Sequence, residues 1–271
     1  MKKSQLLVSV LGILAIVGLY SLPKVVVDNE ENVEGLAEES ESATGMVDMH
    51  EAELTPEQVE ELAKNRNVVE NASTIEDKLA SAQVLAEIYI ELGKFDSSAY
   101  YYGVIAEETG LPADREVAGD AYYEAFTFAL DPEKVAYLAE ETRSYFNSIL
   151  EENPDRLDLK TKVAMTYVSS ANPMQGITML RGILEEDPQN EEALFNMGIL
   201  SIQSGQYKRA SERFEELVKY HPQNLQGQFY LGVSYFEAKQ NNKAKAQFEL
   251  VKEMTQDEMI LGSIQSYLDQ L

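Results

Sequence analysis

The side chains that could carry out chemistry are few and far apart in the sequence. The two histidines, His50 and His221, are separated by most of the chain, and neither has a second nitrogen ligand nearby. A histidine that binds a metal or acts as a general base needs such partners within reach. We therefore expect both histidines to be solvated surface residues.

Pairs of adjacent carboxylates are the other candidates for acid and base chemistry. They occur at expected helix ends on exposed faces, as Glu140-Glu141, Glu151-Glu152 and Glu185-Glu186. Catalytic carboxylates need burial to separate their pKa values. The sequence also lacks a glycine-rich phosphate loop, a nucleophile elbow and an HExxH stretch. It therefore predicts a protein that is not an enzyme and that uses no metal or cofactor.

Tyrosines gather in the first half of the chain, as Tyr100-Tyr101-Tyr102 and Tyr122-Tyr123. Such side chains usually pack in a core with the phenol group at its edge. A surface on which a ligand stacks is the alternative, and it would make the chain a substrate-binding or enzyme subunit.

The composition excludes several classes of site and partner. The chain has 271 residues, no cysteine, no tryptophan and a formal net charge of -25, so disulfides, thiolate metal sites and lipidated cysteines are excluded. Residues 1–24 carry a charge of +3, residues 25–154 carry -24 and residues 155–271 carry -4. The acids most simply keep a helical surface soluble; a site for a basic partner is the alternative. Nucleic acid is not expected, because an acidic body repels phosphates.

An apolar run follows the basic start of the chain. Lys2 and Lys3 precede Leu6–Leu22, a run close to the minimum of about 17 residues for a single membrane span. Because no small-x-small cleavage site follows, an uncleaved anchor over residues 1–24 is favoured over a signal peptide. The positive-inside rule places the N-terminus in the cytoplasm. In a Gram-negative bacterium this predicts a single-pass inner-membrane protein whose body lies on the periplasmic side.

Residues 25–66 have the composition of an acidic linker. No lysine or arginine occurs from Val25 to Ala63, and too little apolar surface with too much like charge predicts disorder. Near its end, Thr55 suits a helix N-cap, Pro56 the first helical position, and Gln58 the capping box. We expect a short helix near residues 55–65.

Three prolines reveal an internal repeat. Pro154, Pro188 and Pro222 are evenly spaced, and each ends an amphipathic stretch within a similar string. A fixed period of this length, about 34 residues, is typical of a solenoid. The predicted fold class is therefore all-α.

The unit from Glu191 to Asn224 resembles the tetratricopeptide repeat family. The matching positions are Leu194, Met197, Gly198, Gly205, Tyr207, Ala210, Phe214, Leu217 and Pro222. Gly198 and Ala210 are small where two helices cross closely, and Phe214 fills the gap between hairpins. Ser201 departs from the tyrosine that is usual in the family.

The resemblance implies a right-handed superhelical α-solenoid over residues 67–271. Repeats are expected at about 79–112, 157–190, 191–224 and 225–258, with an irregular hairpin at 116–154 and a capping helix at 259–271. The last repeat lacks the turn glycine. The sequence style also resembles tetratricopeptide repeat proteins of Bacteroidetes-type bacteria, which implies no activity.

In this family the first helix of each hairpin lines a concave groove. That geometry implies a groove faced by Thr161, Met165 and Val168, then Phe195, Ile199 and Ile202, then Phe229, Val233 and Phe236. Family members that grip acidic chaperone tails use lysine, asparagine and arginine here, so that clamp is absent. An apolar groove implies an amphipathic helix or hydrophobic peptide as ligand, or occupation by the chain's own terminal helix. For any single residue, packing between repeats is the alternative.

The predicted function is a membrane-anchored, non-catalytic scaffold or adaptor that binds a protein or peptide in the cell envelope. Its predicted binding residues are Met165, Phe195, Ile199, Ile202, Phe229, Val233 and Phe236. A periplasmic chaperone released by signal cleavage, whose groove binds many apolar segments, is the alternative.

Overall fold

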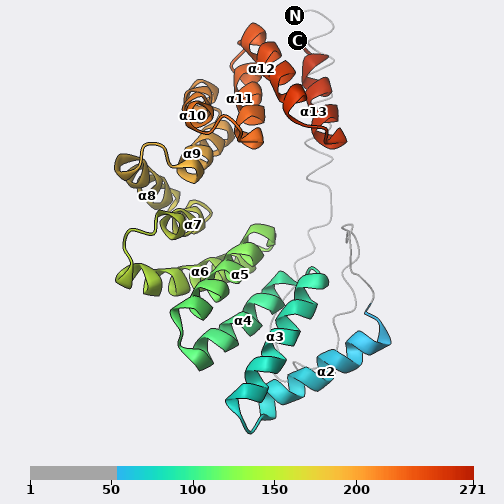
Figure 1. Cartoon of the computed structure of the whole chain (residues 1–271). Coiled ribbons are helices and arrows are strands. Elements are labelled where there is room, and N and C mark those ends of the chain that lie inside the picture. The colour runs from blue at the N-terminus through green and yellow to red at the C-terminus, as the bar shows by residue number, and fades with distance from the viewer. Residues whose placement is uncertain (1–53) are drawn as a thin grey trace, which may run out of the picture. The chain divides into compact units, whose positions relative to one another are not determined.

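The computed structural model describes residues 54–271, which form twelve α-helices and no strand (Figure 1). The apolar run Leu6–Leu22 and the acidic stretch up to residue 53 lie outside the described residues. Within residues 54–271, none of the helices has the length and apolar character needed to cross a membrane. The structure therefore describes the helical body, and the predicted anchor stays a prediction.

Short connections join the helices, whose order confirms the all-α prediction for the described part. They are α2 (Pro56–Asn71), α3 (Ile75–Glu91), α4 (Phe95–Thr109), α5 (Pro112–Phe128), α6 (Pro132–Glu152), α7 (Leu157–Val168), α8 (Pro173–Glu186), α9 (Glu191–Gln203), α10 (Tyr207–Tyr220), α11 (Leu225–Glu237), α12 (Asn241–Met254) and α13 (Glu258–Leu268).

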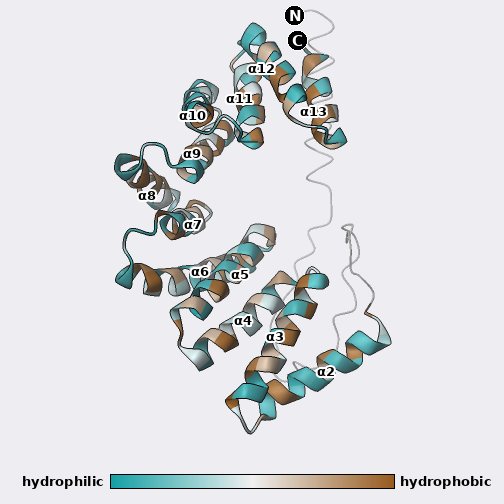
Figure 2. Cartoon of the chain, in the orientation of Figure 1, coloured by the Kyte–Doolittle hydropathy of each residue, from teal (hydrophilic) through white to brown (hydrophobic). Residues whose placement is uncertain are grey.

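Each helix packs mainly on its neighbours in the sequence. From α7 onward the helices form pairs, α7 with α8, α9 with α10 and α11 with α12. Before them, α3, α4, α5 and α6 pack successively, with the most extensive contact between α4 and α5, while α2 packs on α3 and α13 on α12. Most helices carry both apolar and hydrophilic residues, and the buried apolar ones form clusters shared between neighbouring helices (Figure 2). This arrangement is a solenoid of helical hairpins.

The period of the repeat appears in the polar residues that begin the regular hairpins. Asn190 and Asn224 N-cap α9 and α11, accepting hydrogen bonds from the backbone nitrogens of Ala193 at 3.0 Å and Gly227 at 2.6 Å. These caps satisfy backbone donors that have no partner inside the helix. The three periodic prolines lie just after α6, α8 and α10, where a helix cannot continue through them.

A residue in the left-handed region closes the turn in each of the last two hairpins. Gly205, between α9 and α10, has a φ of 70°, which glycine adopts without steric cost. Lys239 takes the same place one repeat later, between α11 and α12, with a φ of 59°. The missing glycine in the last repeat therefore leaves the turn geometry unchanged, at a strain of about 1 kcal/mol.

Small residues let the two helices of a hairpin approach closely. A methyl group on Gly198 would lie 2.5 Å from the ring of Phe214, and one on Gly232 would lie 2.7 Å from the ring of Phe248. Both phenylalanine rings are fully buried. The structure therefore gives Gly198 and Phe214 the roles expected from the sequence.

Two helices have bounds that differ from those expected. α2 continues to Asn71 rather than ending near residue 65, so the expected linker boundary at residue 66 falls inside a helix. Thr55 and Gln58 form the expected capping box. Beyond residue 65, Val69 packs against a cluster with residues of α3 and Arg66 donates a hydrogen bond to Tyr89 of α3, which accounts for the longer helix. α5 begins at Pro112, before the start of the irregular hairpin expected at residue 116, because proline suits the first position of a helix.

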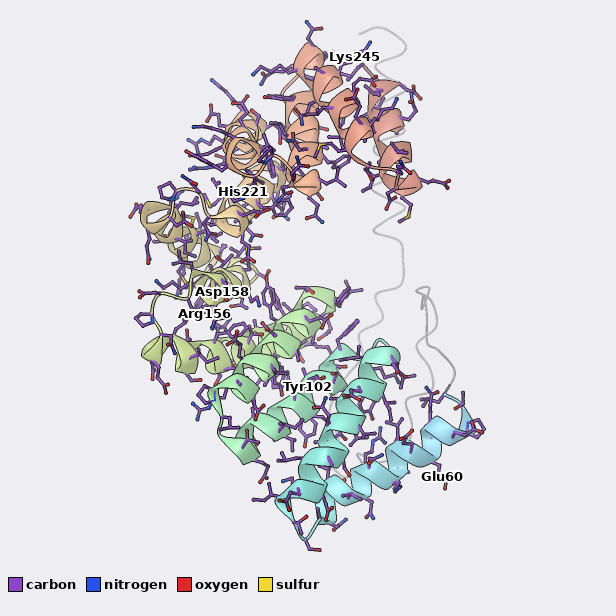
Figure 3. The ribbon with its side chains drawn as sticks, viewed as in Figure 1. Glu60, Tyr102, Arg156, Asp158, His221 and Lys245 are labelled. Atoms are coloured by element: carbon purple, nitrogen blue, oxygen red, sulfur yellow. The ribbon has the colours of Figure 1, made fainter. Side chains whose placement is uncertain are left out.

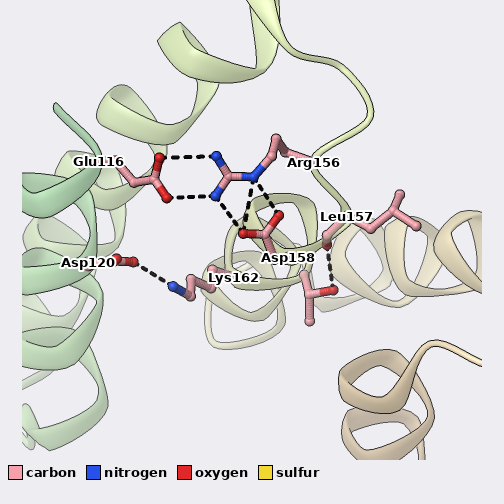
Figure 4. A network of polar contacts seen from close by, with 7 residues as sticks. Glu116, Asp120, Arg156, Leu157, Asp158 and Lys162 are labelled. Atoms are coloured by element: carbon pink, nitrogen blue, oxygen red, sulfur yellow. Dashed lines mark hydrogen bonds and ion pairs between the residues drawn. The ribbon is translucent and has the colours of Figure 1, made fainter. Parts of the chain in front are cut away.

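Arg156 joins the irregular hairpin α5/α6 to the regular repeats (Figure 4). Its guanidinium donates two hydrogen bonds to Glu116 of α5, at 3.0 and 2.6 Å, and its Nε donates to Asp158 of α7 at 2.9 Å. Lys162 of α7 forms an ion pair with Asp120 of α5 at 2.5 Å. Arg156 holds the pKa of Glu116 and the pKa of Asp158 below their usual values. Polar contacts therefore connect α5 and α7 directly.

We expect the variant Arg156→Gln to lower the free energy of unfolding by roughly 1 kcal/mol at neutral pH, because two carboxylates lose a charged partner at a partly exposed site. Since their pKa values are lowered, the stability they contribute is present above about pH 4 and is lost as the pH falls through their folded-state values. Urea unfolding at neutral pH and at about pH 3 measures the free energy of unfolding of the variant and of the parent protein. The difference between these two free energies becomes smaller at the lower pH. A Lys245→Gln variant is the control, and an equal difference at both pH values would contradict the prediction.

Candidate protein-binding surface

The nine residues expected on the groove occupy equivalent positions of α7, α9 and α11. They form three rows with one member from each repeat, which are Thr161, Phe195 and Phe229; Met165, Ile199 and Val233; and Val168, Ile202 and Phe236. Thr161 and Val233 are buried, and the other members are half-buried. These side chains therefore contribute to packing as well as to the surface.

Phe195 packs against the following hairpin. Its ring meets Phe214 of α10 and Tyr230 of α11 edge to face, with centroids 5.9 and 5.7 Å away. Tyr230 in turn stacks on Phe214 at 5.9 Å. This group of three rings fills the joint between α9/α10 and α11, so Phe195 completes the packing between repeats.

The terminal helix α13 packs in a similar way on the last hairpin. Tyr267 stacks on Phe248 of α12 with centroids 5.0 Å apart, and meets Phe229 and Phe236 of α11 edge to face at 6.2 and 5.1 Å. Ile264 of α13 is fully buried in the same cluster. The chain's own terminal helix, one of the occupants expected from the sequence, therefore contacts Phe229 and Phe236.

Met165, Ile199 and Ile202 pack against core clusters with part of each side chain, Ile199 and Ile202 against the cluster that contains Phe214. Each is half-buried, Met165 on α7 and the two isoleucines one turn apart on α9. We call Ile199 and Ile202 the α9 face. Half-buried branched side chains at this spacing suit the apolar side of an amphipathic helix.

A pocket of about 380 Å³ lies between α8, α9 and α10. Its lining includes the apolar side chains Ile177, Met197 and Leu200, the arginines Arg181, Arg209 and Arg213, and Ser201. The sequence singled out Ser201 only as a departure from the family pattern. The arginines could not be predicted as one group from the sequence, because they come from α8 and α10 and no sequence motif links them.

The tyrosine-rich part of the chain contributes mainly to packing. Tyr122 is buried and stacks on Tyr145 at 5.6 Å, and burial raises the pKa of Tyr145 to about 12. Tyr101 stacks on Tyr89 at 5.7 Å, and Arg66 donates a hydrogen bond to the hydroxyl of Tyr89. These contacts support a packing role for the four rings. Tyr100 is 54% exposed and lines a pocket of about 420 Å³ with Tyr101 and Tyr137, so the ligand-stacking surface stays a prediction there.

His221 lies at the end of α10 and connects two repeats (Figure 3). Its Nε2 is 2.7 Å from the carbonyl oxygen of Gln189, and its Nδ1 is 3.2 Å from a carboxylate oxygen of Glu191. His221 therefore links two repeats while its side chain stays 30% exposed, so it is a surface residue as expected, with contacts that the sequence did not indicate. His50 lies outside the described residues. In residues 54–271, histidines and carboxylates do not gather in any group able to hold a metal ion.

Comparisons with known proteins agree with this architecture. The model of the tetratricopeptide repeat family matches residues 172–228 and 201–262. A tetratricopeptide repeat protein from Parabacteroides merdae ATCC 43184 is similar with a TM-score of 0.55 and 18% sequence identity, over 77% of this chain and 78% of that chain. TTC0263, a thermophilic TPR protein in Thermus thermophilus, is similar with a TM-score of 0.50 and 13% identity, over 70% of this chain and 98% of that chain. At these identities the likeness shows the fold alone. No curated protein matches the sequence.

Proposed function

We propose that this chain, whose residues 172–262 match the tetratricopeptide repeat, is a non-catalytic scaffold that holds a protein or peptide partner at a membrane. Repeat arrays of this fold present extended surfaces, and function as a scaffold needs no buried acid, base or metal. The proposed partner element is an amphipathic helix, and its proposed binding residues are centred on the α9 face.

The contact made by α13 is the observation that carries this proposal. Tyr267 packs across Phe229 and Phe236, so the last of the three groove helices receives an apolar helix from the chain itself. On α9, one repeat earlier, Ile199 and Ile202 occupy the positions equivalent to Val233 and Phe236. An external helix with an aromatic or leucine side chain would bury these isoleucines in the same manner.

The membrane part of the proposal rests on the sequence. Lys2 and Lys3 before the apolar run Leu6–Leu22, and the acidic residues after it, support one span with a cytoplasmic N-terminus. In a bacterial envelope this puts the scaffold on the periplasmic side of the inner membrane. Retention of the full-length chain in membranes washed with alkaline carbonate tests the anchor, and release of a shortened chain would contradict it.

Site-specific crosslinking tests the binding surface. A photoreactive phenylalanine analogue is placed at position 199 or 202 of the full-length chain in its native cells. We expect one discrete adduct from each position. In a second experiment, purified partner binds the Ile199→Gln, Ile202→Gln double variant at least roughly tenfold more weakly, because two apolar side chains lose their burial.

Leu250 on α12 provides the matched control, since it is an apolar side chain that is 43% exposed. The analogue at position 250 gives no adduct, and Leu250→Gln leaves partner binding unchanged. Equal adducts from positions 199, 202 and 250 would contradict the proposed surface. A broad set of adducts with many proteins would contradict a dedicated scaffold and favour a chaperone.

A further inference from the structure

One position of the repeat holds a tyrosine in two hairpins and a serine in the hairpin between them. Tyr167 on α7, Ser201 on α9 and Tyr235 on α11 stand at the same place in successive repeats and are therefore equivalent. Each of the two tyrosines packs against a cation. Arg143 lies 4.8 Å from the ring centroid of Tyr167, and Lys243 lies 4.7 Å from that of Tyr235. The middle repeat has a serine, which supplies no ring.

The partners of Tyr235 show what the middle repeat lacks. The Tyr235 hydroxyl donates a hydrogen bond to Glu215 of α10 at 2.5 Å, and Lys243 of α12 forms an ion pair with the same carboxylate at 3.2 Å. The last repeat therefore has a ring, an anion and a cation in one place. At the equivalent positions one repeat earlier, Arg181 of α8 replaces the carboxylate and Arg209 of α10 replaces the lysine.

The pocket between α8, α9 and α10 lies where this repeat lacks the ring and the carboxylate that the last repeat has. Ser201, Arg181 and Arg209 all line it, with apolar surface from Ile177 and Leu200. The interface between α8 and α9 is also smaller than the equivalent interface of the next repeat, since α8 packs less extensively on α9 than α10 packs on α11. The Tyr235 side chain of the next repeat therefore has no counterpart beside Ser201.

The charges around the pocket favour an anion. Within residues 54–271, neither Arg181 nor Arg209 has a carboxylate within ion-pair distance, although Arg209 donates a hydrogen bond to Gln206 at 2.6 Å. Arg213 pairs weakly with Glu216 at 3.6 Å, and Glu212 is the one carboxylate in the lining. Three arginines therefore surround a partly apolar hollow in a chain whose net charge is -25.

We propose that this pocket is a second binding site, which takes a protein segment carrying an aromatic side chain next to carboxylates. The aromatic ring enters the space beside Ser201 and contacts Ile177 and Leu200, while the carboxylates accept hydrogen bonds from Arg181 and Arg209. Arginine suits this role because its planar group both pairs with carboxylates and stacks on rings. The ligand restores the combination of ring, anion and cation that the last repeat contains within itself.

This site is separate from the α9 face. In an α-helix of 3.6 residues per turn, Ser201 and Met197 point to the side of α9 opposite Ile199 and Ile202. Ser201→Tyr therefore tests the pocket without altering the α9 face. Loss of one binding activity and retention of the other distinguishes the two proposals.

Fluorescence anisotropy with a labelled peptide tests the proposal on the full-length chain in detergent. The probe is a short peptide with one phenylalanine flanked by glutamates. Ser201→Tyr abolishes binding because the new ring fills the hollow, as Tyr235 does one repeat later. The Arg181→Gln, Arg209→Gln double variant weakens binding by roughly tenfold or more, because charged hydrogen bonds are lost. Both variants keep the helical circular dichroism of the parent, and Ser201→Tyr melts at the same or a higher temperature.

Lys208 supplies the matched control for charge, because it is an exposed cation beside Arg209 that does not line the pocket. Lys208→Gln binds the peptide as the parent does. Three results would overturn the proposal. They are unchanged binding to folded Ser201→Tyr, equal binding of a peptide with alanine in place of phenylalanine, and displacement of the peptide by inorganic phosphate as effectively as by unlabelled peptide.

Discussion

Replacing Phe214 with alanine lowers the free energy of unfolding by about 3–5 kcal/mol. Phe214 is fully buried in α10, and its ring fills the space that Gly198 leaves open on α9. The same ring stacks on Tyr230 of the next hairpin and meets Phe195 edge to face. Its removal therefore opens a cavity inside one hairpin and at the joint with the next.

Urea unfolding followed by circular dichroism measures this loss. Because repeat arrays can unfold in steps, the midpoint of the transition that involves α9 to α13 is the relevant quantity. Leu130→Ala is the control, since Leu130 is 95% exposed and its replacement changes the free energy by no more than about 0.5 kcal/mol. A loss below about 1 kcal/mol for Phe214→Ala would contradict the packing described.

Replacing Gly176 with alanine lowers the free energy of unfolding by about 2–3 kcal/mol. A methyl group at Gly176 on α8 would lie 2.3 Å from the carbonyl oxygen of Ala164 and 2.8 Å from the backbone nitrogen of Val168, both on α7. Backbone atoms in a helix cannot move aside as a flexible side chain can. The two helices must therefore separate.

Gly182, also on α8, is the matched control for this substitution. A methyl group there would meet no atom within 4 Å. Gly182→Ala raises the free energy of unfolding by about 0.4–1 kcal/mol, because alanine favours the helix and restricts the unfolded chain. Thermal melting of the two variants side by side checks the opposite signs. A change in stability of the same sign in both variants would show that helix propensity, and not the close approach of α7, determines the stability of Gly176→Ala.

The parts of the fold that follow local rules could be predicted from the sequence. The periodic prolines marked the ends of α6, α8 and α10, and Thr55 with Pro56 marked the start of α2, because caps and prolines act on the backbone nearby. The family resemblance supplied α11 and α12. The end of α2 could not be predicted in this way. It depends on packing of Val69 against a cluster with α3, a contact that polar composition alone does not reveal.

The structure places the candidate binding residues on their expected helices and gives some of them a packing role, while the binding groove itself stays a prediction. The family geometry placed Phe195 and Phe229 on α9 and α11, and both lie there, but each ring packs under a tyrosine of a later helix. Such contacts depend on which side chains of two helices meet, and an amphipathic pattern specifies only the side of each helix. For the same reason, Arg181 and Arg209 could not be connected with Ser201 before the helices were placed in space.

We also expect the hollow beside Ser201 to affect the cooperativity of unfolding. In a linear array, a hairpin is stabilised by its own contacts and by the interface with its neighbours, so a thin interface transmits little stability across it. The joint between α8 and α9 is such an interface, and Ser201 removes the ring that would strengthen it. We therefore expect the residues before and after this joint to unfold as two units, which hydrogen exchange of the full-length chain would show as two levels of protection. A ligand seated in the hollow would bind both units at once and make their unfolding a single event.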